Sequence, residues 1–240
     1  MYIVDPSDYY WGPVTSTIDW CEENYIVSPY IAEFFNTITN LGFVFFSLFG
    51  IYNVFRNNAM LYVACIMIWQ TFIVDPISTI GIKLPIALAI CSGTISYVYI
   101  IINDPVFHQV SYALLVFCIV FRAILLVGRV PNEYNTYEKP RLQLLLWLAA
   151  LGFILSFAIW NIDNIYCVSL KSWRSTVSTL TGSVSELHGW WHIGTALGVY
   201  YFIVFCEWIQ PVLVDSHNQY RLYWFGPLCY LRPLTKLKSL

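Results

Sequence analysis

The sequence predicts an all-α, polytopic integral membrane protein, and its composition and hydropathy pattern both indicate this fold class. Hydrophobic residues make up 58% of the 240 residues and charged residues only 11%, with a mean hydropathy of +0.63. Soluble domains carry about 25% charged residues. Apolar stretches long enough to cross about 30 Å of hydrocarbon recur along the chain. Membrane lipids are therefore the expected surroundings, and no nucleic-acid partner is expected.

Five apolar stretches are predicted to span the membrane, namely residues 34–55, 84–103, 106–128, 143–161 and 189–209. A sixth stretch, 60–74, is short and ends at Asp75 and Pro76, although extension to residue 82 would bring it to spanning length. Residues 1–33 hold six acidic residues, no Lys or Arg and no apolar core, so no cleavable signal peptide is expected. The first span should act as its own insertion signal.

The distribution of basic residues predicts an odd number of spans. Cytosolic loops are enriched in Lys and Arg, so the N-terminal segment without basic residues should be lumenal. The tail should be cytosolic because it carries Arg221, Arg232, Lys236 and Lys238. If 60–74 also spanned, Lys83, Arg129 and the whole tail would fall on the wrong side. A crossing by region 60–83 would therefore make the number of spans even and conflict with the positions of the basic residues.

These observations divide the chain into three parts. Residues 1–33 form an acidic lumenal segment, 34–213 a transmembrane helix bundle and 214–240 a basic cytosolic tail. The chain ends in KLKSL, which resembles the Lys-x-Lys-x-x retrieval signals of endoplasmic reticulum membrane proteins. Basic residues after a final span are common in any case, so this match is weak by itself.

The run HGWWH, residues 188–192, is the most informative motif. Two histidines four residues apart lie on one face of a helix, so His188 and His192 can point at the same metal ion. The alternative is an aromatic belt at the membrane interface, where amphipathic rings lie at headgroup level.

Five blocks of the chain form a specific pattern, namely 11–25 (WGPVTSTIDWCEENY), 30–40 (YIAEFFNTITN), 105–110 (PVFHQV), 160–167 (WNIDNIYC) and the run at 188–192. In order and wording these blocks resemble alkaline ceramidases, and the likeness is best to the phytoceramidase branch. The resemblance implies a seven-helix membrane amidohydrolase of the endoplasmic reticulum and Golgi. Such proteins cleave ceramides or related sphingolipids to a sphingoid base and a fatty acid.

The resemblance fails between Ile66 and about Tyr97. Family members carry there a Ser and a His four residues apart, a later Asp, and the rest of one helix followed by another. A missing block of that size would remove about one crossing. It would leave 60–74 as the stump of the second helix and five or six spans where relatives have seven. The charge parity and the missing motif thus indicate the same deletion.

The resemblance assigns His188 and His192 to a zinc site. In that family three histidines hold a zinc ion that activates water for attack on the amide carbonyl, while a nearby carboxylate accepts the proton. The third ligand, the carboxylate and the oxyanion-stabilising Ser belong to the missing block, so two histidines should bind zinc weakly. Asp75 and Ser78 are the polar residues near the lost motif. The matched family positions do not use His108 as a ligand.

The acidic N-terminal segment predicts a calcium site. Asp19, Glu22, Asn24 and Glu33 offer hard oxygen ligands at close spacing, as calcium prefers. In the resembling family these positions bind calcium together with the backbone carbonyl of Trp20. A solvated acidic loop is the alternative, because the spacing is not that of an EF-hand.

Seven cysteines occur, most of them in apolar spans where they act as small hydrophobic residues. Cys21 and Cys167 both fall on the lumenal side when the number of spans is odd, and oxidation is possible there. We therefore predict a disulfide between them, with a pair of free thiols as the alternative.

The resulting functional hypothesis is a zinc-dependent ceramidase that takes its substrate from the bilayer. Because a corner of the zinc site is missing, the competing hypothesis is an inactive relative that binds sphingolipid or partner helices. A seven-helix receptor without chemistry fits the hydrophobicity but not the blocks around Asp19 and His188.

Overall fold

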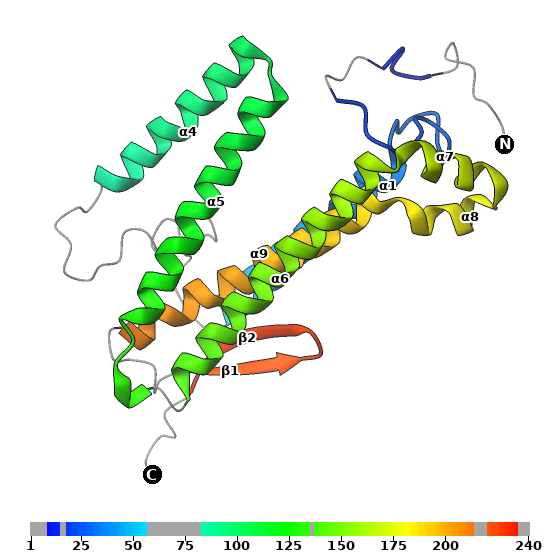
Figure 1. Ribbon diagram of the computed structural model, residues 1–240. Helices are drawn as coiled ribbons and strands as arrows, with labels where there is room; N and C mark the ends of the chain where they lie inside the picture. The colour runs from blue at the N-terminus through cyan, green and yellow to red at the C-terminus, as the bar shows by residue number, and fades with distance from the viewer. Residues whose placement is uncertain (1–8, 15–17, 57–82, 135–136, 214–219, 235–240) are drawn as a thin grey trace. The chain divides into compact units, whose positions relative to one another are not determined.

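The computed structural model describes residues 9–14, 18–56, 83–134, 137–213 and 220–234 (Figure 1). The possible span 60–74, the polar candidates Asp75 and Ser78 and the retrieval-type signal at the C-terminus lie outside the described residues. The described part consists of helices joined by short turns, together with one antiparallel pair of strands.

The helices are α1 (Phe34–Thr39), α2 (Leu41–Arg56), α4 (Lys83–Ile102), α5 (Pro105–Gly128), α6 (Glu138–Ile165), α7 (Cys167–Thr176), α8 (Thr179–Gly182) and α9 (Leu187–Leu213). Short 3-10 helices lie at Asn132–Tyr134 and Ser183–Ser185. Among the described residues, four segments are long and apolar enough to cross a membrane: Phe34–Asn53, Pro105–Gly128, Glu138–Ile165 and Leu187–Leu213. A shorter apolar helix covers Ala89–Ile102. The predicted class, an all-α polytopic membrane protein, is confirmed.

Local sequence explains where these helices begin and end. The Asp104 carboxylate accepts a hydrogen bond from Val106 N at 2.9 Å, and Pro105 occupies the first turn of α5, where a missing N–H costs nothing. α6 extends several residues beyond the predicted span 143–161 at both ends. Hydropathy detects only the apolar centre of a helix, whereas backbone hydrogen bonding continues through polar ends such as Glu138 and Asp163.

The chain forms two compact units. One contains residues 1–48 and 148–200, and the other contains 49–147 and 201–240. Helices α2, α6 and α9 each contribute a segment to both units. All of the predicted metal ligands and both predicted disulfide cysteines belong to the first unit.

In the first unit, α6 and α9 approach closely through small residues. A Cβ atom added to Gly152 of α6 would lie 3.0 Å from Gly198 Cα and 3.2 Å from Gly194 O of α9. A Cβ atom added to Gly194 would lie 2.2 Å from the Ser156 hydroxyl oxygen. Small residues four positions apart allow membrane helices to pack backbone against backbone. This packing fixes the N-terminal part of α9, which carries the histidines.

The second unit contains a β-hairpin that the sequence analysis did not predict. Strand β1 (Tyr220–Phe225) pairs antiparallel with β2 (Leu228–Pro233), and Phe225 faces Leu228 across a two-residue turn. Gly226 begins this turn with a φ of 56°, a conformation that favours glycine. The Tyr201 hydroxyl donates a hydrogen bond to Pro227 O at 2.5 Å and so ties the turn to α9.

Candidate metal-binding and active site

His188 and His192 lie in the first two turns of α9, and both are buried, with 4% and 6% of their surface exposed. Their ring centroids are 4.9 Å apart and the rings are nearly perpendicular, at 88°. The structure therefore brings the two predicted zinc ligands together, as their four-residue spacing on one helix requires.

Aromatic rings enclose this pair. The Trp20 ring lies 4.4 Å from His188, and the Trp191 ring lies 5.0 Å from His188 and 4.8 Å from His192. Phe43 contacts His192 edge to face, with centroids 6.1 Å apart. An apolar wall of this kind limits the access of water and strengthens electrostatic interactions inside the site.

The two imidazoles differ in their hydrogen bonding. His192 Nδ1 lies 3.0 Å from the Thr39 hydroxyl oxygen. His188 Nδ1 is buried and has no hydrogen-bond partner among the described residues. A buried ring nitrogen without a donor or acceptor is unusual, because such groups are nearly always paired. A ring nitrogen that has no hydrogen-bond partner and lies beside a second imidazole is suited to be a metal ligand.

The pair fits zinc only in part. Two imidazole nitrogens supply two of the three protein ligands that a catalytic zinc commonly has. No group of three or more His, Cys, Asp or Glu side chains that could hold a metal ion exists in the part of the chain that the structure describes.

The predicted calcium ligands occupy the loop before α1 and its first residues. Asn24 Nδ2 donates to Asp19 Oδ1 at 2.8 Å, and Trp20 N donates to Glu33 Oε1 at 3.3 Å. The side chain of Asn36 also donates to Glu33. These residues form separate hydrogen-bonded pairs, and the carboxylates of Asp19, Glu22 and Glu33 do not converge on one point in the part of the chain that the structure describes.

Glu22 has a structural role that the sequence analysis did not predict. Its two carboxylate oxygens accept hydrogen bonds from Phe35 N and Asn36 N, each at 2.8 Å, at the N-terminus of α1. The carboxylate therefore caps the first turn of this helix from a position earlier in the chain. Burial raises the pKa of Glu22, while the hydrogen bonds from Asn36 and Phe35 lower it and nearby Glu33 raises it.

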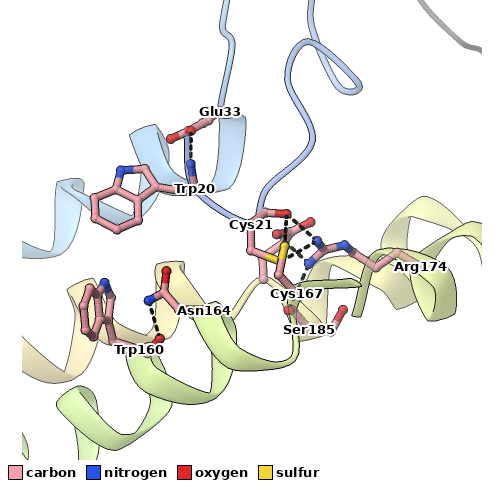
Figure 2. The surroundings of a disulfide bond; sticks show 9 residues. Trp20, Cys21, Glu33, Trp160, Asn164, Cys167, Arg174 and Ser185 are labelled. Atoms are coloured by element: carbon pink, nitrogen blue, oxygen red, sulfur yellow. Dashed lines mark hydrogen bonds and ion pairs between the residues drawn. A yellow bond between two sulfur atoms is a disulfide. The ribbon is translucent and has the colours of Figure 1, made fainter. Parts of the chain in front are cut away.

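A disulfide joins Cys21 to Cys167, with their Cα atoms 5.4 Å apart, and this is the pair that the sequence analysis predicted (Figure 2). Arg174 of α7 lies beside it and is 8% exposed. Its guanidinium donates to Cys21 O at 2.6 Å and to Glu186 Oε2 at 2.9 Å. Helix α7 and the segment before α9 are thereby tied to the N-terminal loop.

Glu186 completes this charged cluster. Burial raises the pKa of its carboxyl to about 8, and the neighbouring carboxylates of Glu22, Asp163 and Glu23 act in the same direction, although Arg174 lowers it. A cavity of about 370 Å³ adjoins the cluster and is lined in part by Glu22, Arg174 and Glu186. Neither histidine lines this cavity, so it is separate from the candidate zinc site.

Besides Arg174 and Glu186, sequence reasoning missed Thr39 and Asp163 in this region. Thr39 contacts His192, and the only signal for it was its position in the matched block 30–40. Asp163 is 1% exposed, and its carboxylate lies near the backbone N–H of Leu187 at the start of α9 and near the charge of Arg174. An ionisable residue at the end of an apolar helix was the available signal for Asp163.

Comparison with known proteins identifies the family. The profile of the family described as Ceramidase matches residues 12–59 and 57–232, which is most of the chain. The chain belongs to the ceramidase family. It is 34% identical to alkaline ceramidase 3 of Mus musculus, over 95% of this chain and 96% of that protein. It is 28% identical to an alkaline ceramidase of Saccharomyces cerevisiae, over 89% of this chain and 83% of the relative, and 24% identical to one of Arabidopsis thaliana, over 96% and 97%.

The alignment with this ceramidase of mouse extends over 265 positions, although the chain has only 240 residues. At least 25 positions of that relative therefore have no counterpart here. The family profile also matches in two pieces, which meet at residues 57–59. A missing stretch is what the sequence analysis predicted, but the break in the profile match lies before Ile66, so the limits Ile66 and Tyr97 stay a prediction.

Proposed function

We propose that this ceramidase-family chain cleaves the N-acyl bond of ceramides to release a sphingoid base and a fatty acid, with zinc held by His188 and His192. One observation supports this most directly. Two buried imidazoles lie edge to face on α9, with ring centroids 4.9 Å apart, inside a segment that the family profile covers. When bound, zinc would act as a Lewis acid that activates water toward the amide carbonyl.

The chain's own residues supply the remaining parts of this mechanism. His188 and His192 would hold the ion, and the rings of Trp20 and Trp191 would exclude bulk water from it. Described spanning helices also expose large apolar side chains, such as Phe117 of α5 and Leu151 of α6. These surfaces suit the acyl and sphingoid tails of a substrate that enters from the bilayer.

A second candidate function is supported by the incomplete ligand set. Among the described residues no third His, Cys, Asp or Glu joins the pair, and two histidines hold zinc poorly. The alternative is a catalytically inactive relative that binds sphingolipid or partner helices through the same apolar surfaces.

We also propose a structural calcium ion in the N-terminal loop. Asp19, Glu22, Asn24 and Glu33 would supply side-chain oxygens, and Trp20 its backbone carbonyl. The hydrogen bonds of Asn24 to Asp19 and of Trp20 N to Glu33 support this, because each holds two of the proposed ligand residues side by side. Hard oxygen ligands of this type select calcium over softer metals.

The proposed location is the endoplasmic reticulum or Golgi membrane, with the N-terminus in the lumen and the C-terminus in the cytosol. The absence of Lys and Arg from residues 1–33 and the basic tail support this orientation. The Cys21–Cys167 disulfide also supports it, because disulfides persist in oxidising compartments. Protease protection of tags at the two termini in sealed microsomes would test the orientation.

Metal analysis and ceramide turnover of the purified full-length chain test the proposed activity. We expect about one zinc per chain and turnover that His188→Ala and His192→Ala abolish. His108→Ala is the matched control, since it removes an imidazole outside the pair and should leave zinc and turnover unchanged. Absence of both zinc and turnover, together with retained binding of a non-hydrolysable ceramide analogue, would favour the inactive relative instead.

A further inference from the structure

The Thr39 hydroxyl, at the end of α1, has three polar neighbours. Its oxygen lies 2.7 Å from Phe35 O, 3.2 Å from Asn36 O and 3.0 Å from His192 Nδ1. A hydroxyl has one proton to donate and two lone pairs to accept with. The two carbonyl oxygens can only accept, so the single proton must point to them if these short contacts are to be hydrogen bonds.

This assignment determines the proton on His192. If the Thr39 proton pointed to Nδ1, the hydroxyl and Phe35 carbonyl oxygens would face each other at 2.7 Å without a hydrogen between them. With the proton on the carbonyl side, the hydroxyl accepts from Nδ1–H. The backbone carbonyl of Asn36, which lies 3.2 Å from the same hydroxyl, also interacts with the His192 ring and can only accept, so it too favours a ring proton on this side. Neutral histidine carries one ring proton, so Nε2 of His192 then holds a free lone pair.

The glycine inside the HGWWH run allows this contact. A Cβ atom at Gly189 would lie 3.0 Å from Thr39 Cγ2 and 3.4 Å from its hydroxyl oxygen. Any larger residue at this position would push Thr39 away from α9. Gly189 therefore allows α1 to approach α9. The HGWWH run provides space for Thr39 in addition to its two histidines.

The other end of α1 is fixed independently. The Glu22 carboxylate accepts hydrogen bonds from Phe35 N and Asn36 N in the first turn of α1. Because α1 has only six residues, fixing its first turn also fixes the position of Thr39, its last residue. The Glu22 cap thus fixes the start of α1, and the absence of a side chain at Gly189 lets Thr39 lie against α9.

We propose that Thr39 is a positioning residue that holds His192 in the Nδ1–H tautomer and so directs its Nε2 lone pair to a metal ion. The tautomer follows from the hydrogen bonds alone, while its consequence for zinc rests on the proposed function. Outer hydrogen bonds of this kind commonly fix the tautomer of metal-binding histidines, and their loss costs about 10- to 100-fold in affinity.

The tautomer can be measured without metal. The full-length chain, labelled with ¹⁵N-histidine and freed of metal, carries only four histidines, and His192→Gln identifies the signals of His192. At about pH 8, above the ordinary histidine pKa of about 6.5, we expect a pyrrole-type Nδ1 and a pyridine-type Nε2. Thr39→Val, which keeps the shape but removes the acceptor, should mix the tautomers, and Thr39→Ser should restore the wild-type pattern.

Competition titration with a zinc chelator gives the second readout. Thr39→Val should weaken zinc binding about 10- to 100-fold, and Thr39→Ser should stay within about threefold of wild type. A pyridine-type Nδ1 in the wild-type chain, or an unchanged spectrum in Thr39→Val, would overturn the proposal. A wild-type chain that shows the expected tautomer and binds no zinc would instead refute the proposed zinc-dependent function. Unchanged circular dichroism of the variants controls for misfolding.

Discussion

Arg174 Nη2 donates a hydrogen bond to the backbone carbonyl of Cys21 at 2.6 Å, although 153 residues separate the two in sequence. The same guanidinium pairs with Glu186, two residues before His188. One buried cation therefore joins the N-terminal loop, α7 and the start of α9. Removing one partner leaves a buried polar group without its hydrogen bond at a cost of about 1 to 3 kcal/mol.

We expect Arg174→Gln to lower the free energy of unfolding by about 2 kcal/mol, because it removes the hydrogen bonds that the guanidinium donates to the Glu186 carboxyl and to Cys21 O. Thermal unfolding in detergent would measure this. Lys171→Gln, which removes a positive charge from the same helix at a half-buried position, is the control and should change stability by less than about 1 kcal/mol. Equal effects of the two variants would contradict the buried linkage.

The disulfide makes a prediction of its own. Closing a loop between residues 146 positions apart restricts the unfolded chain, so Cys21→Ser should lower stability by about 2 to 4 kcal/mol. Cys167→Ser and the double variant should lose the same amount, because either change removes the same bond. Mild reductant should lower the unfolding midpoint of the wild type to that of the variants and leave theirs unchanged. If reductant lowered the unfolding midpoint of the wild type and of the variants by the same amount, the disulfide would be absent from the wild type.

The sequence predicted the parts of this structure that depend on bulk hydrophobicity and on short spacing. Hydropathy located the helices to within a few residues, because about 20 apolar residues are needed to cross a membrane. The four-residue interval between His188 and His192 predicted their common face, since one helical turn decides it. The odd number of spans also predicted one long-range contact, because it placed Cys21 and Cys167 together on the lumenal side, where they can be oxidised.

Contacts that depend on tertiary packing could not be predicted in this way. The Glu22 carboxylate was predicted only as a calcium ligand, and its capping of α1 was missed because only the folded loop brings it to Phe35 N. Thr39 was an unremarked residue until the folded chain placed it against His192. The hairpin at Tyr220–Phe225 was hidden in a basic tail, although Gly226 and Pro227 between two aromatic segments are a turn signal.

The calcium proposal predicts a ligand-dependent stability. Calcium at about 100 times its dissociation constant should stabilise the chain by about 2.7 kcal/mol relative to a chelator. Asp19→Asn should abolish this gain and leave stability in chelator nearly unchanged, because Asp19 is exposed and bonds only to the nearby Asn24 in the described loop. Glu133→Gln removes an acid from an exposed 3-10 helix and should retain the full calcium effect. A calcium response that survives Asp19→Asn would contradict the site.

Glu22 should behave differently from Asp19. Glu22→Gln removes one of two carboxylate oxygens that cap α1, so it should lower stability by about 1 to 2 kcal/mol even in chelator. Comparing the unfolding midpoints of both variants with and without calcium separates the capping role from ion binding. A Glu22→Gln chain that is as stable as wild type in chelator would show that the cap contributes nothing.

The contact between α6 and α9 predicts that replacing glycine by alanine lowers stability inside the contact and raises it outside. Gly152→Ala would place a methyl group 3.0 Å from Gly198 Cα, and a backbone atom cannot move aside cheaply. We expect a loss of about 1 to 3 kcal/mol in unfolding free energy. Gly50→Ala is the matched control, because a Cβ atom there meets nothing within 4 Å. Alanine has less backbone freedom than glycine in the unfolded chain, so this change should stabilise α2 by about 0.5 to 1 kcal/mol. Because α9 carries His188 and His192, Gly152→Ala should also weaken zinc binding, whereas Gly50→Ala should not. Stabilisation by both variants would mean that the two helices do not pack through these glycines.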